Sequence, residues 1–302
     1  MKLAILLLCH KGPEQINMFL KALNHKDITI FIHVDRKAHM DLTNINTENV
    51  IVLPDYLRVN VQWAKISQVS ATLNLLKYAV EYGDYDYFWL CSGQDYPIKN
   101  VNDILTFFRN DVSKNYLNLF DSLNFNLGHC NNYDKRNQIV FKEWMISRKF
   151  IVRLMKRLYI EFTGGYDKTW PIFQRKDCPD MKFFFGSQWW CLNKVTVTWM
   201  LNYLNKHSEY YEFFSTCLCP DESFFHTLVM NSPYAGEQED YLHYIDWSEG
   251  KNSPKILLSE DYGRINKSNK LMARKFDLEA DDNILQILSE NNLSANEIIV
   301  KK

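Results

Sequence analysis

Short apolar runs and amphipathic stretches alternate through the first hundred residues. Residues 13–23 and 67–82 carry apolar side chains at helical spacing, and Pro13 opens the first of these stretches. Four apolar runs have the composition of buried strands, residues 3–9, 28–35, 50–53 and 87–91. This order of elements predicts an α/β fold with a mixed, mostly parallel sheet flanked by helices.

Polar side chains follow three of the predicted strands. His10 comes directly after the first strand, Asp35 ends the second, and Asp95 lies just beyond the fourth. Ligands of open α/β sheets bind beyond the carboxyl ends of the strands. These residues therefore predict a cleft of the nucleotide-binding type.

The middle of the chain is less regular. Residues 110–180 mix Asn-rich and charged stretches with a basic amphipathic segment, residues 148–159. A solvated helix fits this segment, and so does peripheral contact with an anionic membrane or a lipid-linked substrate. Order returns at residues 183–192, and a helix over 195–205 and an edge strand over 241–247 are predicted.

We expect a single domain, because no repeat or low-complexity linker interrupts the 302 residues. Its nucleotide-binding half is predicted over residues 1–110 and its acceptor and catalytic half over 111–302. The hydrophobic content of 46% supports a large core, and the net charge of -1 gives no reason to expect a nucleic-acid partner.

The number and spacing of the cysteines, together with hydropathy, indicate where in the cell the protein is expected. The seven cysteines are scattered without CxxC spacing, which favours a reduced, cytoplasmic protein without a structural zinc. The apolar start of the chain fits a first strand better than a signal peptide, and no run approaches the ~20 apolar residues of a membrane span. The basic segment leaves open a peripheral position at the inner face of the membrane.

Two carboxylates stand together in Pro220-Asp221-Glu222, directly before an apolar run. Proline and acidic residues are typical of the first turn of a helix, so a capped helix from Pro220 to Met230 explains the pattern without any chemistry. The functional interpretation depends on the other motifs of the chain.

Six motifs occur in order: His33-Val34-Asp35, Ser92-Gly93-Gln94-Asp95-Tyr96-Pro97-Ile98-Lys99, Gly186-Ser187-Gln188-Trp189-Trp190, Pro220-Asp221-Glu222-Ser223-Phe224-Phe225, Tyr244-Ile245-Asp246-Trp247 and Ala273-Arg274-Lys275-Phe276-Asp277. Together they resemble the core-2/I-branching β-1,6-N-acetylglucosaminyltransferase family, which includes peptide O-xylosyltransferases. The resemblance implies a GT-A-type fold and an inverting, metal-independent transfer from a UDP-sugar to a glycan hydroxyl. It favours GlcNAc and a β-1,6 linkage, with UDP-xylose as the alternative donor.

The resemblance also implies residue roles. Glu222 is the expected base that takes the proton of the acceptor hydroxyl, and Phe224 and Phe225 would exclude water around it. Asp221 is the expected helix cap.

Asp35 would bind uracil or ribose, with Trp63 stacked on the base and His10 nearby. Asp95 would lie near the donor sugar, and four residues are candidate sugar-binding or acceptor contacts: Gln188, Trp189, Trp190 and Trp247. One of the two adjacent tryptophans should point inward.

The leaving UDP needs positive charge, which the family supplies with side chains rather than a metal or another cofactor. The matching cations are Arg274 and Lys275, with Lys255 as the second cationic position; without the family, Arg274 and Lys275 would pass for an ordinary solvated pair. The tempting Asp84-Tyr85-Asp86 precedes a strand, at the wrong end of the sheet, and is expected to be a turn.

The chain departs from the family pattern at two positions. His243 stands where bacterial members often have Arg, and Ala64 stands where Gly is expected. The whole pattern favours a bacterial-type enzyme of surface polysaccharide or glycoconjugate synthesis. A non-catalytic carbohydrate-binding protein and a metal hydrolase are the competing classes, and the histidines lack the ligand spacing that the hydrolase needs.

Overall fold

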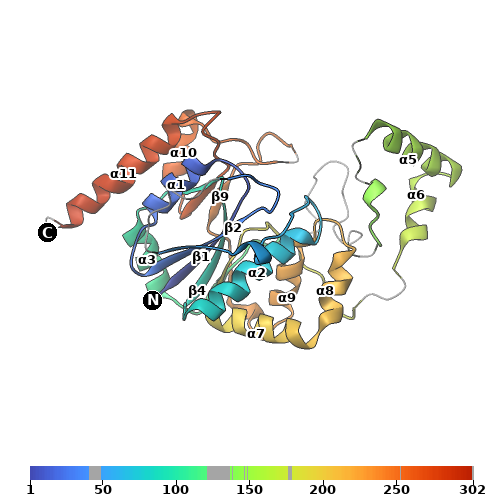
Figure 1. Ribbon diagram of the computed structural model, residues 1–302, viewed down its shortest axis with the longest axis horizontal. Helices are drawn as coiled ribbons and strands as arrows, with labels where there is room; N and C mark the ends of the chain where they lie inside the picture. The colour runs from blue at the N-terminus through green and yellow to red at the C-terminus, as the bar shows by residue number, and fades with distance from the viewer. Residues whose placement is uncertain are drawn as a thin grey trace.

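The computed structural model describes residues 1–40, 49–120, 137, 139–145, 147, 149–175, 179–251 and 253–300. A seven-stranded sheet forms its centre, in the order β3-β2-β1-β4-β7-β6-β8 (Figure 1). Its strands are β1 Leu3–Cys9, β2 Ile28–Val34, β3 Val50–Val52, β4 Tyr87–Ser92, β6 Asn115–Tyr116, β7 Cys191–Asn193 and β8 Gln238–Glu239. β1 pairs in parallel with both β2 and β4, whereas β7 runs antiparallel to β4. The predicted mixed, mostly parallel α/β fold is confirmed, and it is the arrangement expected of a GT-A-type glycosyltransferase.

Alternate side chains of β1 serve two separate cores. Leu3, Ile5 and Leu7 point into a core with α1 and α3, whereas Ala4 and Leu6 point into a core with α2 and α7 on the other face. The helices are α1 Pro13–Ala22, α2 Ser67–Tyr82, α3 Val101–Asn110, α5 Phe150–Phe162, α6 Tyr166–Thr169, α7 Lys194–Lys206, α8 Ser208–Ser215, α9 Phe224–Met230, α10 Tyr262–Lys267 and α11 Asn283–Val300. Burial of both faces explains why the predicted strands are largely apolar rather than alternating.

A second sheet holds the C-terminal motif against the first. It has the order β5-β10-β9, with β5 Asp95–Pro97, β9 His243–Ile245 and β10 Met272–Arg274. β10 lies between the other two, antiparallel to β5 and parallel to β9. β9 is the edge strand predicted over 241–247. This sheet brings Asp95 opposite Arg274, although they are far apart in the sequence.

The helix predicted from Pro220 to Met230 is divided. Pro220–Glu222 forms a 3₁₀ turn, η4, and α9 begins only at Phe224. Phe224 and Phe225 are both buried in the core on the α2 side of the sheet, and the rings of Trp190 and Phe225 lie 5.1 Å apart. That these phenylalanines exclude water around Glu222 stays a prediction, and both are buried directly after the turn that Glu222 ends.

Helices α5 and α6 stand apart from the sheet, at the opposite end of the molecule from α11 (Figure 1). α5 covers the described part of the predicted basic segment, and Arg148 lies outside the described residues. None of the helices in the described ranges combines the length and hydropathy that crossing a bilayer requires.

Candidate active site

A cavity of about 440 Å³ lies at the carboxyl ends of β1, β2 and β4. The strand ends contribute His10 and Asp35, and later segments of the chain close the cavity from the opposite side. Nine residues predicted from the sequence line it: His10, Asp35, Trp63, Gln188, Trp189, Glu222, Trp247, Arg274 and Lys275. Seven segments that are distant in the sequence thus meet where the α/β rule places a ligand.

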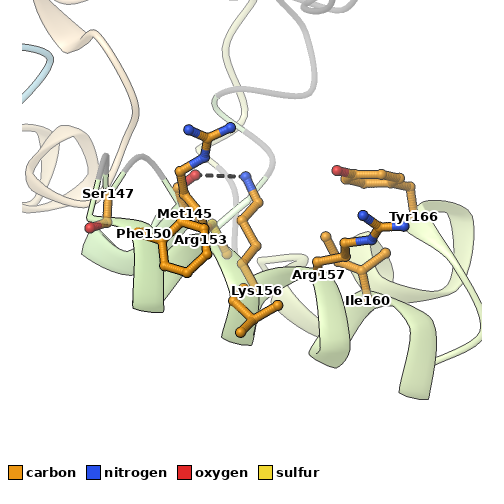
Figure 2. A pocket seen from close by; sticks show the side chains of 9 residues that line it. Met145, Ser147, Phe150, Arg153, Lys156, Arg157, Ile160 and Tyr166 are labelled. Carbon is orange, nitrogen blue, oxygen red and sulfur yellow. Dashed lines mark hydrogen bonds between the residues drawn. The ribbon is translucent and has the colours of Figure 1, made fainter.

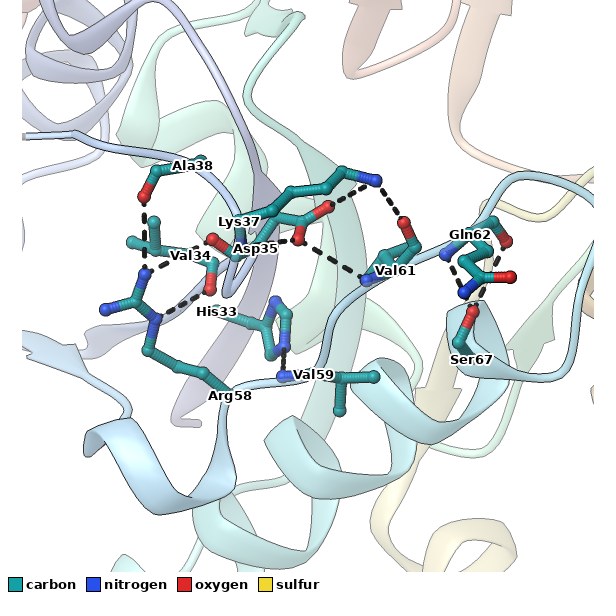
Figure 3. A network of polar contacts seen from close by, with 10 residues as sticks. All are labelled: His33, Val34, Asp35, Lys37, Ala38, Arg58, Val59, Val61, Gln62 and Ser67. Atoms are coloured by element: carbon teal, nitrogen blue, oxygen red, sulfur yellow. Dashed lines mark hydrogen bonds and ion pairs between the residues drawn. The ribbon is translucent and has the colours of Figure 1, made fainter.

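The Asp35 carboxylate fixes the loop beside it (Figure 3). Its Oδ1 accepts hydrogen bonds from the backbone N–H groups of Lys37 at 3.1 Å and Val61 at 3.3 Å. The Lys37 ammonium lies 3.5 Å from Oδ2 and also donates to the Val61 carbonyl. Asp35 is only 5% exposed but lines the cavity, so it is available to a ligand and rigidly held.

His33 has a structural task in the same network. Its Nε2 accepts a hydrogen bond of 2.8 Å from the backbone N–H of Val59, which requires an unprotonated nitrogen (Figure 3). Burial lowers the pKa of His33 to about 4, so the ring stays neutral at physiological pH. The His-Val-Asp motif therefore combines an anchor for residues 58–61 with a carboxylate at the cavity.

Gln68, in the first turn of α2, connects the Trp63 loop to the Glu222 turn. Its Oε1 accepts from the Ala64 backbone N–H at 2.7 Å, and its Nε2 donates to Asp221 Oδ2 at 3.1 Å. The Cys219 backbone N–H donates to the Ala64 carbonyl at 3.0 Å. Asp221 is thus held by α2, and the expectation that it caps a helix is wrong.

Ala64 and Cys219 both have left-handed backbone angles, with φ of 63° and 48°. This region is unfavourable for residues with a Cβ atom and suits glycine. The departure at Ala64, where the family pattern has glycine, therefore falls on a position whose conformation favours that glycine.

Glu222 ends the 3₁₀ turn and lines the cavity. Its backbone N–H donates to the Cys219 carbonyl at 3.1 Å, and its carbonyl accepts from the Gly186 N–H at 2.9 Å. A Cβ atom at Gly186 would lie 1.8 Å from the Asn118 carbonyl oxygen and 2.5 Å from His226 Nε2. Only glycine allows this close approach, which holds the segment before Trp189 against the Glu222 turn.

Arg274 forms a buried, stacked cation at the cavity wall. Its guanidinium lies 3.9 Å from the centroid of the Trp189 ring and 3.1 Å from Asp95 Oδ1. Burial lowers the pKa of Arg274, and Asp95 opposes that shift. The adjacent Lys275 also lines the cavity, and burial together with the charge of Arg274 lowers its pKa. Two cations thus face one cavity, which suits an anionic ligand.

Three predicted site residues lie elsewhere. Asp95 is fully buried behind Arg274 and accepts from the Ser92 N–H at 2.7 Å, so it supports the wall rather than facing a sugar. Trp190 is 1% exposed and belongs to the core, because Trp189 takes the cavity side. Lys255 is held by Asp261 at 2.8 Å and does not line the cavity.

The structure adds residues that the motifs did not indicate. Lys37 brings a further cation to the cavity beside Asp35, and Gln68 holds the turn that carries Asp221 and Glu222. His243 lies beneath the wall, with Nε2 3.2 Å from Asp95 Oδ2. Lys37 could have been found from its place two residues after a strand-terminal acid, whereas nothing in the sequence marks Gln68.

The remaining acidic and potential metal-ligating groups near β4 are already paired. Asp84 pairs with Lys194, and Asp86 with the N-terminus, at the opposite end of β4. Asp84-Tyr85-Asp86 thus lies away from the cavity, as predicted, and is an irregular segment with a bend at Asp86 rather than a turn. Within the described ranges, one group has metal-ligand geometry, Cys91, Asp95 and His243, all buried. The Arg274 guanidinium already pairs with its carboxylate and would repel a cation there.

Comparisons with known proteins identify one family model and several curated relatives that are similar to the chain. The model of the Core-2/I-Branching enzyme family matches residues 3–265. Human xylosyltransferase 1 is 25% identical over 313 residues, which cover 94% of this chain and 30% of that protein. Mouse xylosyltransferase 2 is 23% identical over 316 residues, covering 95% and 33%. The chain thus spans about a third of the length of these curated relatives.

Among solved structures, the galactosyltransferase LgtC in complex with donor and acceptor sugar analogues matches with a TM-score of 0.37 and 8% identity. The match covers 90% of this chain and 86% of that chain. A TM-score this low supports no argument about fold or function.

Proposed function

The chain belongs to the Core-2/I-Branching enzyme family of glycosyltransferases, and on that premise we propose that it transfers a sugar from a UDP-sugar to an acceptor hydroxyl with inversion. The observation that carries the proposal is the meeting of Glu222, Asp35 and the Arg274–Lys275 pair in one cavity. A base, a nucleoside contact and a diphosphate contact are the three functions that an inverting transfer requires.

We assign the base to Glu222. In this assignment its carboxylate accepts the proton of the acceptor hydroxyl while that oxygen attacks the anomeric carbon and the bond to UDP breaks. Support comes from its place on the cavity and from the two backbone hydrogen bonds that fix its turn. A fixed base needs little reorganisation during the reaction.

Arg274 and Lys275 are the proposed counter-charges for the leaving diphosphate. Arg274 is prepositioned by Asp95 and Trp189, and Lys275 follows it at the same wall. Within the described residues, the Lys275 ammonium has no carboxylate at ion-pairing distance, which leaves it available to an anion. On this basis we propose transfer without a metal or another cofactor, since the side chains supply the charge.

Asp35 and Trp63 are the proposed contacts to the nucleoside. Asp35 stands at the end of β2, and Trp63 is 62% exposed beside the cavity, which leaves its ring face available for stacking on a base. His10 lies at the same edge. Trp189, Trp247 and Gln188 remain for the sugars, and Trp189 also carries Arg274 on its ring.

Two donors fit the premise. The motif resemblance favours UDP-GlcNAc and a β-1,6 linkage, whereas the relatives named xylosyltransferases favour UDP-xylose. The acceptor we propose is a hydroxyl of a glycan, a glycoprotein or a lipid-linked glycan. The setting that the sequence pattern favours is a bacterial-type pathway of surface polysaccharide or glycoconjugate synthesis.

The decisive experiment compares Glu222→Gln with the wild type in a transfer assay containing EDTA and a panel of UDP-sugars. We expect turnover to fall about 10³-fold, because a general base is lost, while UDP still raises the melting temperature. Glu81→Gln, at an exposed position of α2, is the matched control and should keep full activity.

Retained turnover in Glu222→Gln would remove Glu222 from the role of base. Activity that EDTA abolishes and Mn²⁺ restores would overturn the metal-free mechanism. Glycan binding that is indifferent to UDP, without any transfer by the wild type, would instead support a carbohydrate-binding protein.

A further inference from the structure

The outer side of α5 exposes a stripe of large apolar side chains. Phe150 is 79% exposed, Ile151 73%, Met155 61%, Leu158 51% and Phe162 90%. At about 100° per residue, these positions fall within about 140° of the helix circumference. Isolated apolar residues on a surface are ordinary, whereas five on one face of a single helix form a contiguous patch.

The opposite side of α5 packs on its own protein. Ile160 is buried, Lys156 Nζ donates to the Met145 carbonyl at 2.8 Å, and the rings of Tyr159 and Trp144 lie 5.7 Å apart. These contacts fix which way the helix faces, so the apolar stripe points to solvent.

Basic side chains flank the stripe. Residues 149–169 contain five Lys or Arg residues and two acidic residues, a net charge of +3 in a chain whose total is -1. Arg153, Lys156 and Arg157 line a groove of about 600 Å³ beside Tyr166 (Figure 2). Arg157 also pairs with Glu161 at 3.1 Å, and both side chains remain largely exposed.

We propose that α5 is an interfacial helix that docks on the surface of an anionic phospholipid bilayer. The apolar stripe would enter the headgroup and acyl boundary, and the flanking cations would pair with lipid phosphates. The charge decides between occupants: a second copy of α5 would bring the same positive charge, whereas anionic headgroups complement it. At 13 residues, about 20 Å long, the helix can lie in the interface but cannot span the ~30 Å hydrocarbon core.

The test is sedimentation of the whole protein with phosphatidylcholine vesicles that contain or lack phosphatidylglycerol. We expect binding to the anionic vesicles only, and a loss of about tenfold in Ile151→Ser/Met155→Ser/Phe162→Ser. Arg153→Gln/Arg157→Gln should also weaken binding, and added salt should weaken binding of the wild type. The matched control is Tyr56→Ser/Val112→Ser/Val195→Ser, which removes three exposed apolar side chains elsewhere and should bind normally.

Equal sedimentation of the wild type with neutral and anionic vesicles would overturn the proposal, as would full binding by the α5 triple variant. A wild type that self-associates in analytical ultracentrifugation, with dissociation in the triple variant and no vesicle binding, would also overturn it. The proposal does not rest on the proposed chemistry, because vesicle binding is measured without substrates. Transfer to a soluble acceptor should be unchanged in the triple variant, whose melting temperature reports that it is folded.

Discussion

Two groups of basic side chains in this molecule carry the same charge but differ in their exposure and in their partners. Arg274 at the cavity is 8% exposed, stacked on Trp189 and paired with the buried Asp95. Arg153 and Arg157 on α5 are exposed, beside an apolar stripe that touches no core. A fixed, desolvated cation can stabilise charge at one position, whereas mobile, hydrated cations suit a diffuse layer of lipid phosphates.

The largest expected difference between the two groups appears when one arginine is removed from each. Arg274→Gln should lower kcat/KM for transfer at least about 100-fold, because the leaving diphosphate loses a prepositioned cation. Arg153→Gln should leave transfer to a soluble acceptor unchanged. Steady-state kinetics with the preferred donor measure both.

The Arg274 variant is also expected to be less stable. The substitution leaves Asp95 buried without its cation, which should lower the free energy of unfolding by about 3 kcal/mol. The double variant Asp95→Asn/Arg274→Gln removes both charges and should recover most of the lost stability but none of the activity. If transfer also recovers in the double variant, Arg274 serves only the fold.

Two glycines, one beside the Glu222 turn and one after α5, differ in how closely their surroundings are packed. Gly186→Ala should lower the free energy of unfolding by about 3 kcal/mol or more, because the new methyl group meets a backbone carbonyl at 1.8 Å. Gly165→Ala, in the turn after α5, meets nothing within 4 Å and should cost only about 1 kcal/mol, for its φ of 103°. Urea unfolding measures both, with Gly263→Ala as the control that has neither problem. Equal losses for Gly186 and Gly165 would contradict the packing argument.

A fall in pH should destabilise the network around His33 at the end of β2, whereas α5 should not be affected. The pKa of His33 is lowered from 6.5 to about 4 by burial, so the unfolded chain takes up the proton first as the pH falls. Its contribution is therefore complete above pH 6.5 and is lost towards pH 4, at most about 3 kcal/mol. His226, with its pKa also lowered to about 4 by burial, adds a loss of the same sign.

Residues 149–175 contain no histidine, so α5 contributes nothing to this slope. Urea unfolding between pH 7.5 and 5 measures it. His33→Asn should flatten the slope. A wild-type stability that rises as the pH falls through this window would show that the sign is wrong.

The smallest effect concerns the loop beside Trp63. Ala64→Gly should raise stability by up to about 1 kcal/mol, because glycine adopts a φ of 63° without the Cβ penalty but loses more entropy on folding. Ala22→Gly in α1 should instead destabilise by about 1 kcal/mol. Melting temperatures that fall in both variants would argue against strain at Ala64.

The sequence predicts the first half of the fold well because β1, β2 and β4 are six or seven residues long and mostly apolar. Strands such as β6 and β8 have two residues each, too few for any periodicity to be detected. The break between Glu222 and Phe224 also escapes prediction, since the same residues are equally suited to a continuous helix.

Site prediction succeeds where a motif fixes the residue and fails where partners decide its orientation. Glu222 and Asp35 line the cavity as expected. Lys255 does not, because Asp261 takes its ammonium, and Trp190 does not, because one of two adjacent tryptophans must enter the core. Arg274 was a plausible solvated residue in the sequence, and only the pairing of β10 with β5 reveals its buried carboxylate partner.

The single side chain of Gln68 has a consequence for how such an enzyme can diverge. A substitution at Gln68 removes hydrogen bonds to the Trp63 loop and to the Glu222 turn at the same time. The two segments therefore cannot change independently through this residue during evolution. The outer face of α5 contacts neither of these segments, so substitutions there leave both in place. A change in the proposed attachment by mutation of α5 therefore leaves the geometry of the Glu222 turn as it is.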